Sequence, residues 1–170
     1  MSETVIRGTA CVFGDFVSAD AILPARYAML GPEEIAAVVL AEHEPTANAR
    51  VRANPILIAG NAFGYGTGRE SSARALRAAG VRAVVGGPFA RMFFRNAINN
   101  GILVVECPAV AAAGIADGET IEIDTATSEV RWQGRSFAMP PVAPFVLDVI
   151  AAGSLIEYGR RIVAAGSVSA

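Results

Sequence analysis

One stretch of the chain reads Pro55-Ile56-Leu57-Ile58-Ala59-Gly60-Asn61-Ala62-Phe63-Gly64-Tyr65-Gly66-Thr67-Gly68-Arg69-Glu70. It starts with a short, continuous apolar run, which is typical of a β-strand covered on both faces. Four glycines within the nine positions from 60 to 68 follow and predict a tight loop. From Glu70 or Ser71 to Ala79 the sequence favours a helix, which Gly80 ends. The stretch therefore predicts a strand, a glycine loop and a helix in that order.

The strand–loop–helix order recurs directly after this stretch. Val81 to Val85 predicts a strand, Phe89 to Asn99 predicts a helix with one apolar face, and Ile102 to Glu106 predicts the next strand. Strands that alternate with helices indicate a parallel sheet flanked by helices. The predicted fold class is therefore α/β, with a mostly parallel, helix-flanked central sheet.

The segment before the glycine loop carries a strand, a loop and a helix. Val5 to Phe13 is predicted as the first strand. Ala21 to Tyr27 contains Pro24, which disfavours a regular strand, and we interpret it as an ordered functional loop. A helix is expected from Gly31-Pro32-Glu33-Glu34 onward, whereas the polar region 44–54 is interpreted as an exposed loop.

The pattern changes in the last third of the chain. Residues 108–116 are predicted to be helical. Glu119 to Asp124 and Glu129 to Trp132 alternate polar and apolar residues, which is typical of an antiparallel β ribbon with one wet face. Pro144 to Ala152 is the last predicted helix, and the small and polar residues 166–170 predict a disordered tail.

The composition excludes several classes of function. All 14 basic residues are arginines, so Schiff-base, pyridoxal phosphate and P-loop lysine chemistry is excluded. His43, Cys11 and Cys107 are too few soft ligands for a zinc or iron–sulfur site built by this chain alone, so we expect no metal site on it. A formal charge of −2 argues against nucleic acid as a partner, because a phosphate-binding surface needs a basic excess.

The length and the termini predict one domain in the cytoplasm. A chain of 170 residues without a linker predicts a single domain over residues 1–165. Met1 to Thr9 lacks the apolar region of a signal peptide, and no stretch reaches the ~18 apolar residues of a membrane span. Two unpatterned cysteines indicate reduced thiols, so a cytoplasmic protein without a membrane partner is expected.

The glycine loop is the strongest candidate for a binding site. A glycine-rich turn at a helix N-terminus presents backbone N–H groups and the positive end of the helix dipole, which attract anions. Gly66, Gly68 and Arg69 are therefore candidate anion-binding residues, and Arg69 suits a carboxylate or phosphate held through two hydrogen bonds. Thr67, between two glycines, can present its hydroxyl group to the ligand.

The glycine loop has three other possible interpretations: a dinucleotide-binding motif, a P-loop, and a turn that serves packing alone. A dinucleotide-binding motif requires a third glycine where the chain has Arg69, and a P-loop requires a lysine. Both are excluded by these residues. The remaining alternative is that the glycines only allow the strand to pack closely on the helix.

Three motifs in the chain, taken in order, resemble one known family. They are Gly14-Asp15-Phe16-Val17-Ser18-Ala19-Asp20-Ala21-Ile22-Leu23-Pro24-Ala25-Arg26-Tyr27, then Gly64-Tyr65-Gly66-Thr67-Gly68-Arg69-Glu70, and then Ala90-Arg91-Met92-Phe93-Phe94-Arg95-Asn96 with Asn100-Gly101-Ile102-Leu103. They are similar to the swivel domain of the aconitase superfamily, and more narrowly to the separate small subunits of 3-isopropylmalate dehydratase. Those subunits carry G-D-N-I-D-T-D-x-I-I-P-A-R-Y-L, F-G-x-G-S-S-R-E-H, and S-F-A-x-I-F-x-x-N with N-G-L. The similarity runs from about Val5 to Gly153.

The resemblance implies a single swivel-type domain that serves as the small subunit of a heterodimeric hydro-lyase. Its large partner would hold a [4Fe–4S] cluster, and this chain no cofactor. The implied reaction dehydrates and rehydrates a branched 2-hydroxy dicarboxylate, with the isomerisation of 2-isopropylmalate and 3-isopropylmalate in leucine biosynthesis as the leading expectation. The small subunit of a methylmalate or dimethylmalate hydratase, and a non-catalytic anion-binding or regulatory subunit, are the alternatives.

The resemblance also assigns roles to individual residues. The family's serine base falls on Thr67, its serine neighbour on Gly68, and its carboxylate-binding arginine on Arg69. Arg26 and Tyr27 begin what the family uses as a substrate-selecting loop.

Each of these roles has a structural alternative. Thr67 is either the base or a helix-entry cap, and Asp20 either orients base or substrate or caps the turn before Ile22. Arg26 either contacts substrate or packs over Pro24. The chain departs from the family pattern at Thr67, which adds a methyl group, at Gly68, which has no side chain, and at Phe16, where the family has asparagine.

Overall fold

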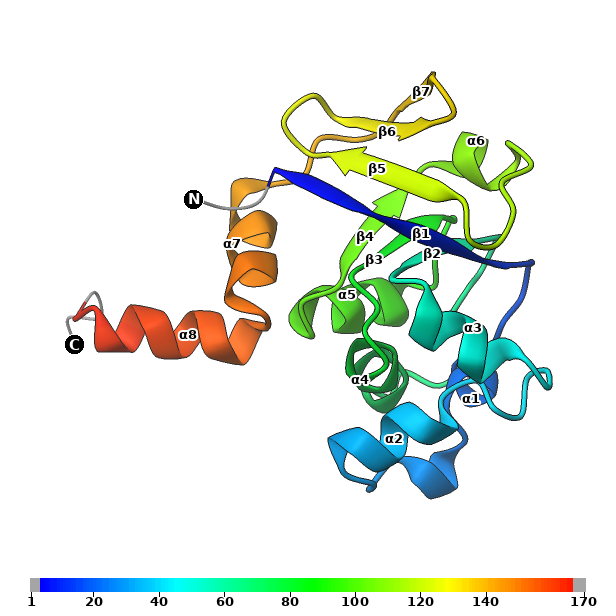
Figure 1. Cartoon of the computed structure of the whole chain (residues 1–170). Coiled ribbons are helices and arrows are strands. Elements are labelled where there is room, and N and C mark those ends of the chain that lie inside the picture. The colour runs from blue at the N-terminus through cyan, green and yellow to red at the C-terminus, as the bar shows by residue number, and fades with distance from the viewer. Residues whose placement is uncertain (1–3, 167–170) are drawn as a thin grey trace.

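The computed structural model describes residues 4–166, which form one seven-stranded mixed sheet with helices around it (Figure 1). The strand order is β4-β3-β2-β1-β5-β6-β7. The strands are β1 (Val5–Phe13), β2 (Ile56–Ala59), β3 (Ala83–Gly86), β4 (Leu103–Glu106), β5 (Thr120–Asp124), β6 (Glu129–Trp132) and β7 (Arg135–Ala138).

Eight α-helices and one short 3-10 helix are described in residues 4–166. They are α1 (Ala19–Ile22), the 3-10 helix (Ala25–Tyr27), α2 (Pro32–Val38), α3 (Ala47–Ala53), α4 (Ser71–Ala78), α5 (Arg91–Asn99), α6 (Pro108–Ala111), α7 (Pro144–Ala152) and α8 (Leu155–Ala164). None of them is long and apolar enough to cross a membrane.

The parallel half of the sheet confirms the predicted α/β class. Strands β1 to β4 run parallel, with Leu57 of β2 opposite Val84 of β3 and Val84 opposite Val104 of β4. All four residues of β2 and all four of β3 are buried, because each strand is covered on both faces. The short apolar runs in the sequence therefore correspond to central strands.

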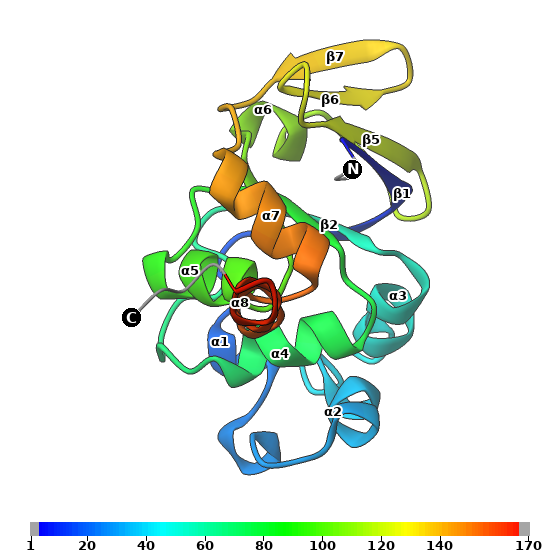
Figure 2. The same ribbon diagram turned by 90° about the vertical axis from the view of Figure 1, so that its left-hand side faces the viewer.

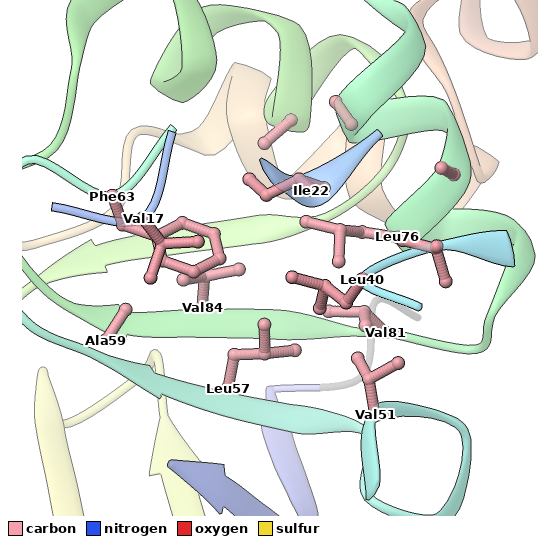
Figure 3. Packing of buried hydrophobic residues seen from close by; sticks show 14 of the residues in the cluster. Val17, Ile22, Leu40, Val51, Leu57, Ala59, Phe63, Leu76, Val81 and Val84 are labelled. Atoms are coloured by element: carbon pink, nitrogen blue, oxygen red, sulfur yellow. The ribbon is translucent and has the colours of Figure 1, made fainter. Parts of the chain in front are cut away.

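Two cores lie on opposite faces of this parallel half. Helices α1 to α5 cover one face, where Leu57, Ala59 and Val84 meet side chains of the helices and connecting loops (Figure 3). Those side chains include Val17, Ile22, Leu40, Val51, Phe63, Leu76 and Val81. The other face packs against α6 and the antiparallel strands, because the sheet curls over it. The glycine loop leaves the carboxyl end of β2 towards the helical face.

The antiparallel half begins where β5 pairs with β1, with Ile6 opposite Ile123. The predicted ribbon of β5 and β6 is confirmed, and β7 extends it. Strand β7 was not predicted, because its residues are mostly exposed and its sequence lacks a clear alternation of apolar and polar residues. Gln133 and Gly134 form its two-residue hairpin loop, and both have positive φ, as this kind of turn requires.

The prediction that residues 44–54 form an exposed loop is wrong. Helix α3 occupies most of this region, and it buries Ala47 and Val51, four residues apart. Arg50 fixes the helix to the sheet, because its guanidinium group donates to the Val12 carbonyl at 2.6 Å and pairs with Asp117. An arginine that looks like a surface residue therefore anchors a helix.

Two further predictions need correction near the C-terminus. The helix predicted over 108–116 ends at Ala111, and Gly114 follows in a left-handed conformation. Pro144–Ala152 is confirmed as α7, but it is not the last helix, since α8 follows. Figure 2 shows α8 end-on, projecting from the body of the domain, and it has no buried residue. The predicted tail lies outside the described residues apart from Gly166.

Candidate functional site

The loop after β1 and the glycine loop after β2 pair with each other. Backbone hydrogen bonds join them, among them those from Phe16 N to Asn61 O (2.8 Å), from Gly64 N to Val17 O (2.7 Å) and from Ala19 N to Tyr65 O (2.7 Å). Asp15 strengthens the pairing, because its carboxylate accepts the Asn61 backbone N–H at 2.6 Å. Parallel neighbouring strands place their carboxyl ends at one edge of the sheet, so the motifs around Asp20 and Arg69 come together there.

The glycines of the loop serve two different purposes. Gly64 allows close packing, since a Cβ atom there would lie 2.2 Å from Cγ of Phe93. Gly66 has a φ of +102°, which disfavours other residues, yet a Cβ atom would meet nothing within 4 Å. A Cβ atom at Gly68 would make an ordinary 3.4 Å contact with Met92. Close packing therefore does not explain Gly66 or Gly68, which lie in an exposed part of the loop.

Helix α5 holds the second half of the glycine loop. Asn96 donates to the Gly68 carbonyl at 3.2 Å, and Asn100 donates to the Glu70 carboxylate at 2.9 Å. These two asparagines lie four residues apart and face the loop together. The sequence analysis assigned them no role, although both lie in the motif that carried the family resemblance.

Asp20 and Arg69 meet at the edge of this loop pair. The Asp20 Oδ1 atom lies 3.3 Å from a terminal nitrogen of Arg69, and the side chains are 55% and 46% exposed. The alternative that Asp20 is only a cap is wrong, because Ser18 is the N-cap of α1 and accepts the Ala21 N–H. An exposed pair of this kind contributes little to stability, so Arg69 can exchange this contact for one with a ligand.

Thr67 lies between Gly66 and Arg69 and is half-buried. The N-cap of α4 is Glu70, so the alternative that Thr67 caps this helix is wrong. In the sequence, Thr67 precedes Arg69 by two residues and the first residue of α4 by four.

Arg26 and Tyr27 form a separate cluster around Glu42. Arg26 makes an ion pair with Glu42, and the Tyr27 hydroxyl group donates to the same carboxylate oxygen at 3.0 Å. Hydrogen bonds from Arg26 and then Tyr27 hold the pKa of Glu42 below its usual value. The Arg26 guanidinium carbon also lies 4.7 Å from the centre of the Tyr27 ring. Arg26 therefore packs over Tyr27, whereas the sequence had suggested packing over Pro24.

The sequence analysis missed Glu42, which lies between α2 and α3 and reaches Arg26 only through the tertiary fold. The segment that carries this cluster also contacts α4, the helix that follows the glycine loop. Arg74 of α4 donates a hydrogen bond to the carbonyl of Ala28, the residue after Tyr27. The structure therefore brings Asp20 and Arg69 into contact, and it places Arg26 and Tyr27 on the adjoining segment that α4 supports.

This chain has only two cysteines, fewer than the thiolates that an iron–sulfur cluster needs. Cys11 and Cys107 are both buried, and burial raises the pKa of the Cys11 thiol to about 11. Within residues 4–166, no three His, Cys, Asp or Glu side chains are grouped so as to hold a metal ion.

The fold and the site define a swivel domain of the aconitase type, and residues 32–110 match the family model described as the aconitase C-terminal domain. The match extends over nearly the whole chain in individual proteins. A 3-isopropylmalate dehydratase small subunit from Moorella thermoacetica is 41% identical over 92% of this chain and 96% of its own length. This chain belongs to the family of 3-isopropylmalate dehydratase small subunits.

Two further proteins support the assignment. A 3-isopropylmalate dehydratase small subunit 1 from Methanopyrus kandleri is 41% identical over 92% of this chain and 94% of its own length. The crystal structure of 3-isopropylmalate dehydratase from Methanocaldococcus jannaschii superposes with a TM-score of 0.82 and 30% identity, covering 96% of this chain and 99% of that chain. The expected family resemblance is thereby confirmed.

Proposed function

We propose that this chain is the small subunit of a cytoplasmic hydro-lyase that interconverts 2-isopropylmalate and 3-isopropylmalate, and that it completes the active site of a larger iron–sulfur subunit. The observation that carries the proposal is the position of Arg69. It lies on an exposed glycine loop, directly before α4, in a chain that belongs to the small-subunit family. The paired Asp20–Arg69 edge is open to solvent, as a half-site that a second subunit closes must be.

Arg69 is proposed to bind a carboxylate of the substrate. A guanidinium group can hold a carboxylate through two parallel hydrogen bonds. The exposed backbone at Gly66 and Gly68 and the N-terminus of α4 add partial positive charge on the same side. When substrate binds, its carboxylate takes the place of the Asp20 carboxylate on Arg69.

Thr67 is proposed to remove the proton from the carbon next to that carboxylate. A hydroxyl group is a weak base at its ordinary pKa and needs a positive environment to act as an alkoxide. Arg69 and the N-terminus of α4 supply such an environment. Because Thr67 directly precedes Gly68 and Arg69, one short loop would both hold the substrate carboxylate and accept the neighbouring proton.

The large subunit is proposed to hold the [4Fe–4S] cluster, since this chain has only two cysteines and such a cluster needs three or four thiolate ligands. Such a cluster supplies a Lewis acid that assists loss of the substrate hydroxyl group. The residues of this chain then bind, orient and deprotonate the substrate.

The proposed substrate carries an aliphatic branch. The Arg26–Tyr27 cluster continues into Ala28-Met29-Leu30, and Met29 is 94% exposed. An exposed apolar side chain beside the site suits an aliphatic substituent better than a third carboxylate. Malates with a methyl or dimethyl substituent are the alternative substrates, because Thr67 and Gly68 depart from the glycine-loop motif of the family.

A panel of 2-hydroxy diacids tests the proposed substrate. The chain is co-expressed anaerobically with its large subunit, and formation of the alkene diacid is followed by absorbance. We expect the highest kcat/KM with isopropylmalate and lower values with methylmalate, dimethylmalate and citrate. A complex with an intact cluster that turns over none of these diacids would contradict the enzymatic function.

A non-catalytic, anion-binding subunit is the second candidate. The observation that favours it is the replacement of the family's two serines by Thr67 and Gly68, which removes one hydroxyl group from the loop. Such a subunit would bind dicarboxylates through Arg69 and would not depend on the Thr67 hydroxyl group for any activity of the complex.

A further inference from the structure

We propose that Phe16 and Tyr65 form an aromatic anchor that inserts into an apolar recess on the large subunit. This inference rests on the proposed function, which requires such a partner. The two rings lie on the paired loops described above. Their centres are 6.4 Å apart with an angle of 83° between their planes, and the residues are 66% and 44% exposed.

The backbone holds Phe16 outward at a conformational cost. Its φ of +57° lies in the left-handed region, which is unfavourable for a bulky side chain. The hydrogen bond from Phe16 N to Asn61 O fixes this conformation, and the next residue, Val17, is buried in the core. Phe16 therefore adopts an unfavourable backbone conformation, and its large apolar ring lies in solvent, where it contributes nothing to core packing.

The surroundings of the pair favour the large subunit as the partner. Tyr65 directly precedes Gly66, so any subunit that closes over Arg69 also covers these rings. Met92 of α5 also lies near Gly68, since a Cβ atom built there would be 3.4 Å from it, and Met92 is 50% exposed. Aromatic residues and methionine are enriched at the centres of protein interfaces.

The charges beside this surface predict the chemistry of the partner. Arg91 and Arg95 of α5 are exposed next to Met92, and all three line a surface pocket of about 560 Å³ that also contains Glu106. The two arginines leave a net positive charge at this pocket. Complementary charge across the interface requires carboxylates on the large subunit. The binding site on the large subunit is thus an apolar recess with an acidic rim. The association of the two subunits is expected to weaken as the salt concentration rises.

A second exposed aromatic pair provides a matched control. Phe145 of α7 and Tyr158 of α8 lie 5.4 Å apart at 89°, and Phe145 is 54% exposed. In Figure 1, α8 lies at the opposite side of the domain from α1, the helix that follows Phe16 and Val17, although α7 and α8 both contact α5. This pair has the same geometry and chemistry, but no place in the proposed interface.

The test compares Phe16→Asn with Phe145→Asn. Asparagine tolerates the left-handed conformation, so Phe16→Asn removes the ring without adding backbone strain. The affinity of each purified variant for the cluster-loaded large subunit is measured anaerobically by calorimetry. We expect Phe16→Asn to raise the Kd roughly 10- to 100-fold, as loss of a central interface aromatic does, and Phe145→Asn to change it less than about twofold. Thermal unfolding confirms that both variants are folded.

Measurements of turnover and of self-association test whether the substrate or a second copy of this chain, rather than the large subunit, covers the two rings. At saturating large subunit, Phe16→Asn is expected to keep the wild-type kcat/KM. An unchanged Kd with a lower kcat/KM would overturn the proposal and make the rings part of the substrate pocket. A wild-type homodimer that Phe16→Asn dissociates, with unchanged affinity for the large subunit, would also overturn it. If the wild-type complex forms but turns over no diacid, the proposed function fails, while a raised Kd for Phe16→Asn still supports the anchor.

Discussion

The Asp20 carboxylate and the Arg69 guanidinium group lie 3.3 Å apart although 49 residues separate them in the chain. Parallel pairing of β1 with β2 brings their loops to the same edge of the sheet, and the backbone bonds between the loops hold them there. Both side chains remain about half exposed, so a ligand carboxylate can reach Arg69 from solvent.

Replacing Arg69 by lysine is expected to weaken substrate binding. Lysine keeps the charge but cannot hold a carboxylate with two parallel hydrogen bonds. A hydrogen bond between charged groups contributes about 1.5–3 kcal/mol, so kcat/KM for isopropylmalate should fall roughly 10- to 150-fold, mainly through KM. Steady-state kinetics of the complex measure this change. Asp20→Asn is the control and should have a smaller effect, and an unchanged KM for Arg69→Lys would remove Arg69 from the site.

Removing the Thr67 hydroxyl group is expected to abolish turnover without abolishing binding. Thr67→Ala deletes the proposed base and should lower kcat by about 10²–10⁴-fold, whereas Thr67→Ser keeps a hydroxyl group and should stay active. Substrate affinity, measured by equilibrium binding to the complex, should change little in both variants. Wild-type turnover by Thr67→Ala would favour the non-catalytic subunit instead.

Gly64→Ala is expected to destabilise the fold. The new Cβ atom would lie 2.2 Å from Phe93, and the φ of +78° is unfavourable for alanine. Crowding of about 1–3 kcal/mol and a backbone cost of about 1–2 kcal/mol predict a total loss of about 2–5 kcal/mol in guanidinium denaturation. Gly66→Ala is the control, because its Cβ atom meets open space and only the backbone cost applies. Equal stabilities of the two variants would show that Phe93 does not constrain the loop.

Asp124 is expected to link stability to acidic pH. Backbone N–H groups of Thr127 and Ala126 donate to its carboxylate and hold its pKa below the usual value. A lowered pKa in the folded state stabilises the fold above the unfolded pKa of about 4, and the contribution is lost as pH falls through the folded pKa. Asp124→Asn should therefore lower the Tm at pH 7.

The difference in Tm between wild type and Asp124→Asn should narrow as pH falls below the unfolded pKa of about 4, and should vanish below the folded pKa, where the carboxyl group is protonated in both states. Thermal unfolding of both proteins across this pH range measures it. A difference that is constant with pH would show that the contribution of Asp124 does not depend on its charge.

Much of the fold could be predicted because its central strands are continuous apolar runs separated by glycine-ended helices. Helix α3 escaped prediction because only Ala47 and Val51 mark its buried face. Helix α8 has no buried residue and contains Gly159, which weakens a helical pattern. Its one usable signal was Ser154, which caps the helix by accepting the Glu157 N–H.

The sequence alone predicted only those parts of the candidate site that lie within one motif. Thr67 and Arg69 lie within one loop, so the sequence alone placed them together. The family resemblance assigned Asp20 and Arg69 to one site, but the direct contacts of Asp20 with Arg69 and of Glu42 with Arg26 join distant segments, which the pattern of a single sequence does not reveal. The exposure of Phe16 and Tyr65 likewise depends on how the two loops pair.

Reconstitution with the large subunit tests the central claim most directly. Anaerobically purified large subunit with an intact cluster is titrated with this chain, and alkene diacid formation from 2-isopropylmalate is followed by absorbance. We predict no turnover by either chain alone and a rate that rises to a plateau at one small subunit per large subunit. A large subunit that reaches the full rate by itself, or a stable complex that stays inactive, would contradict the assignment of this chain as a catalytic small subunit.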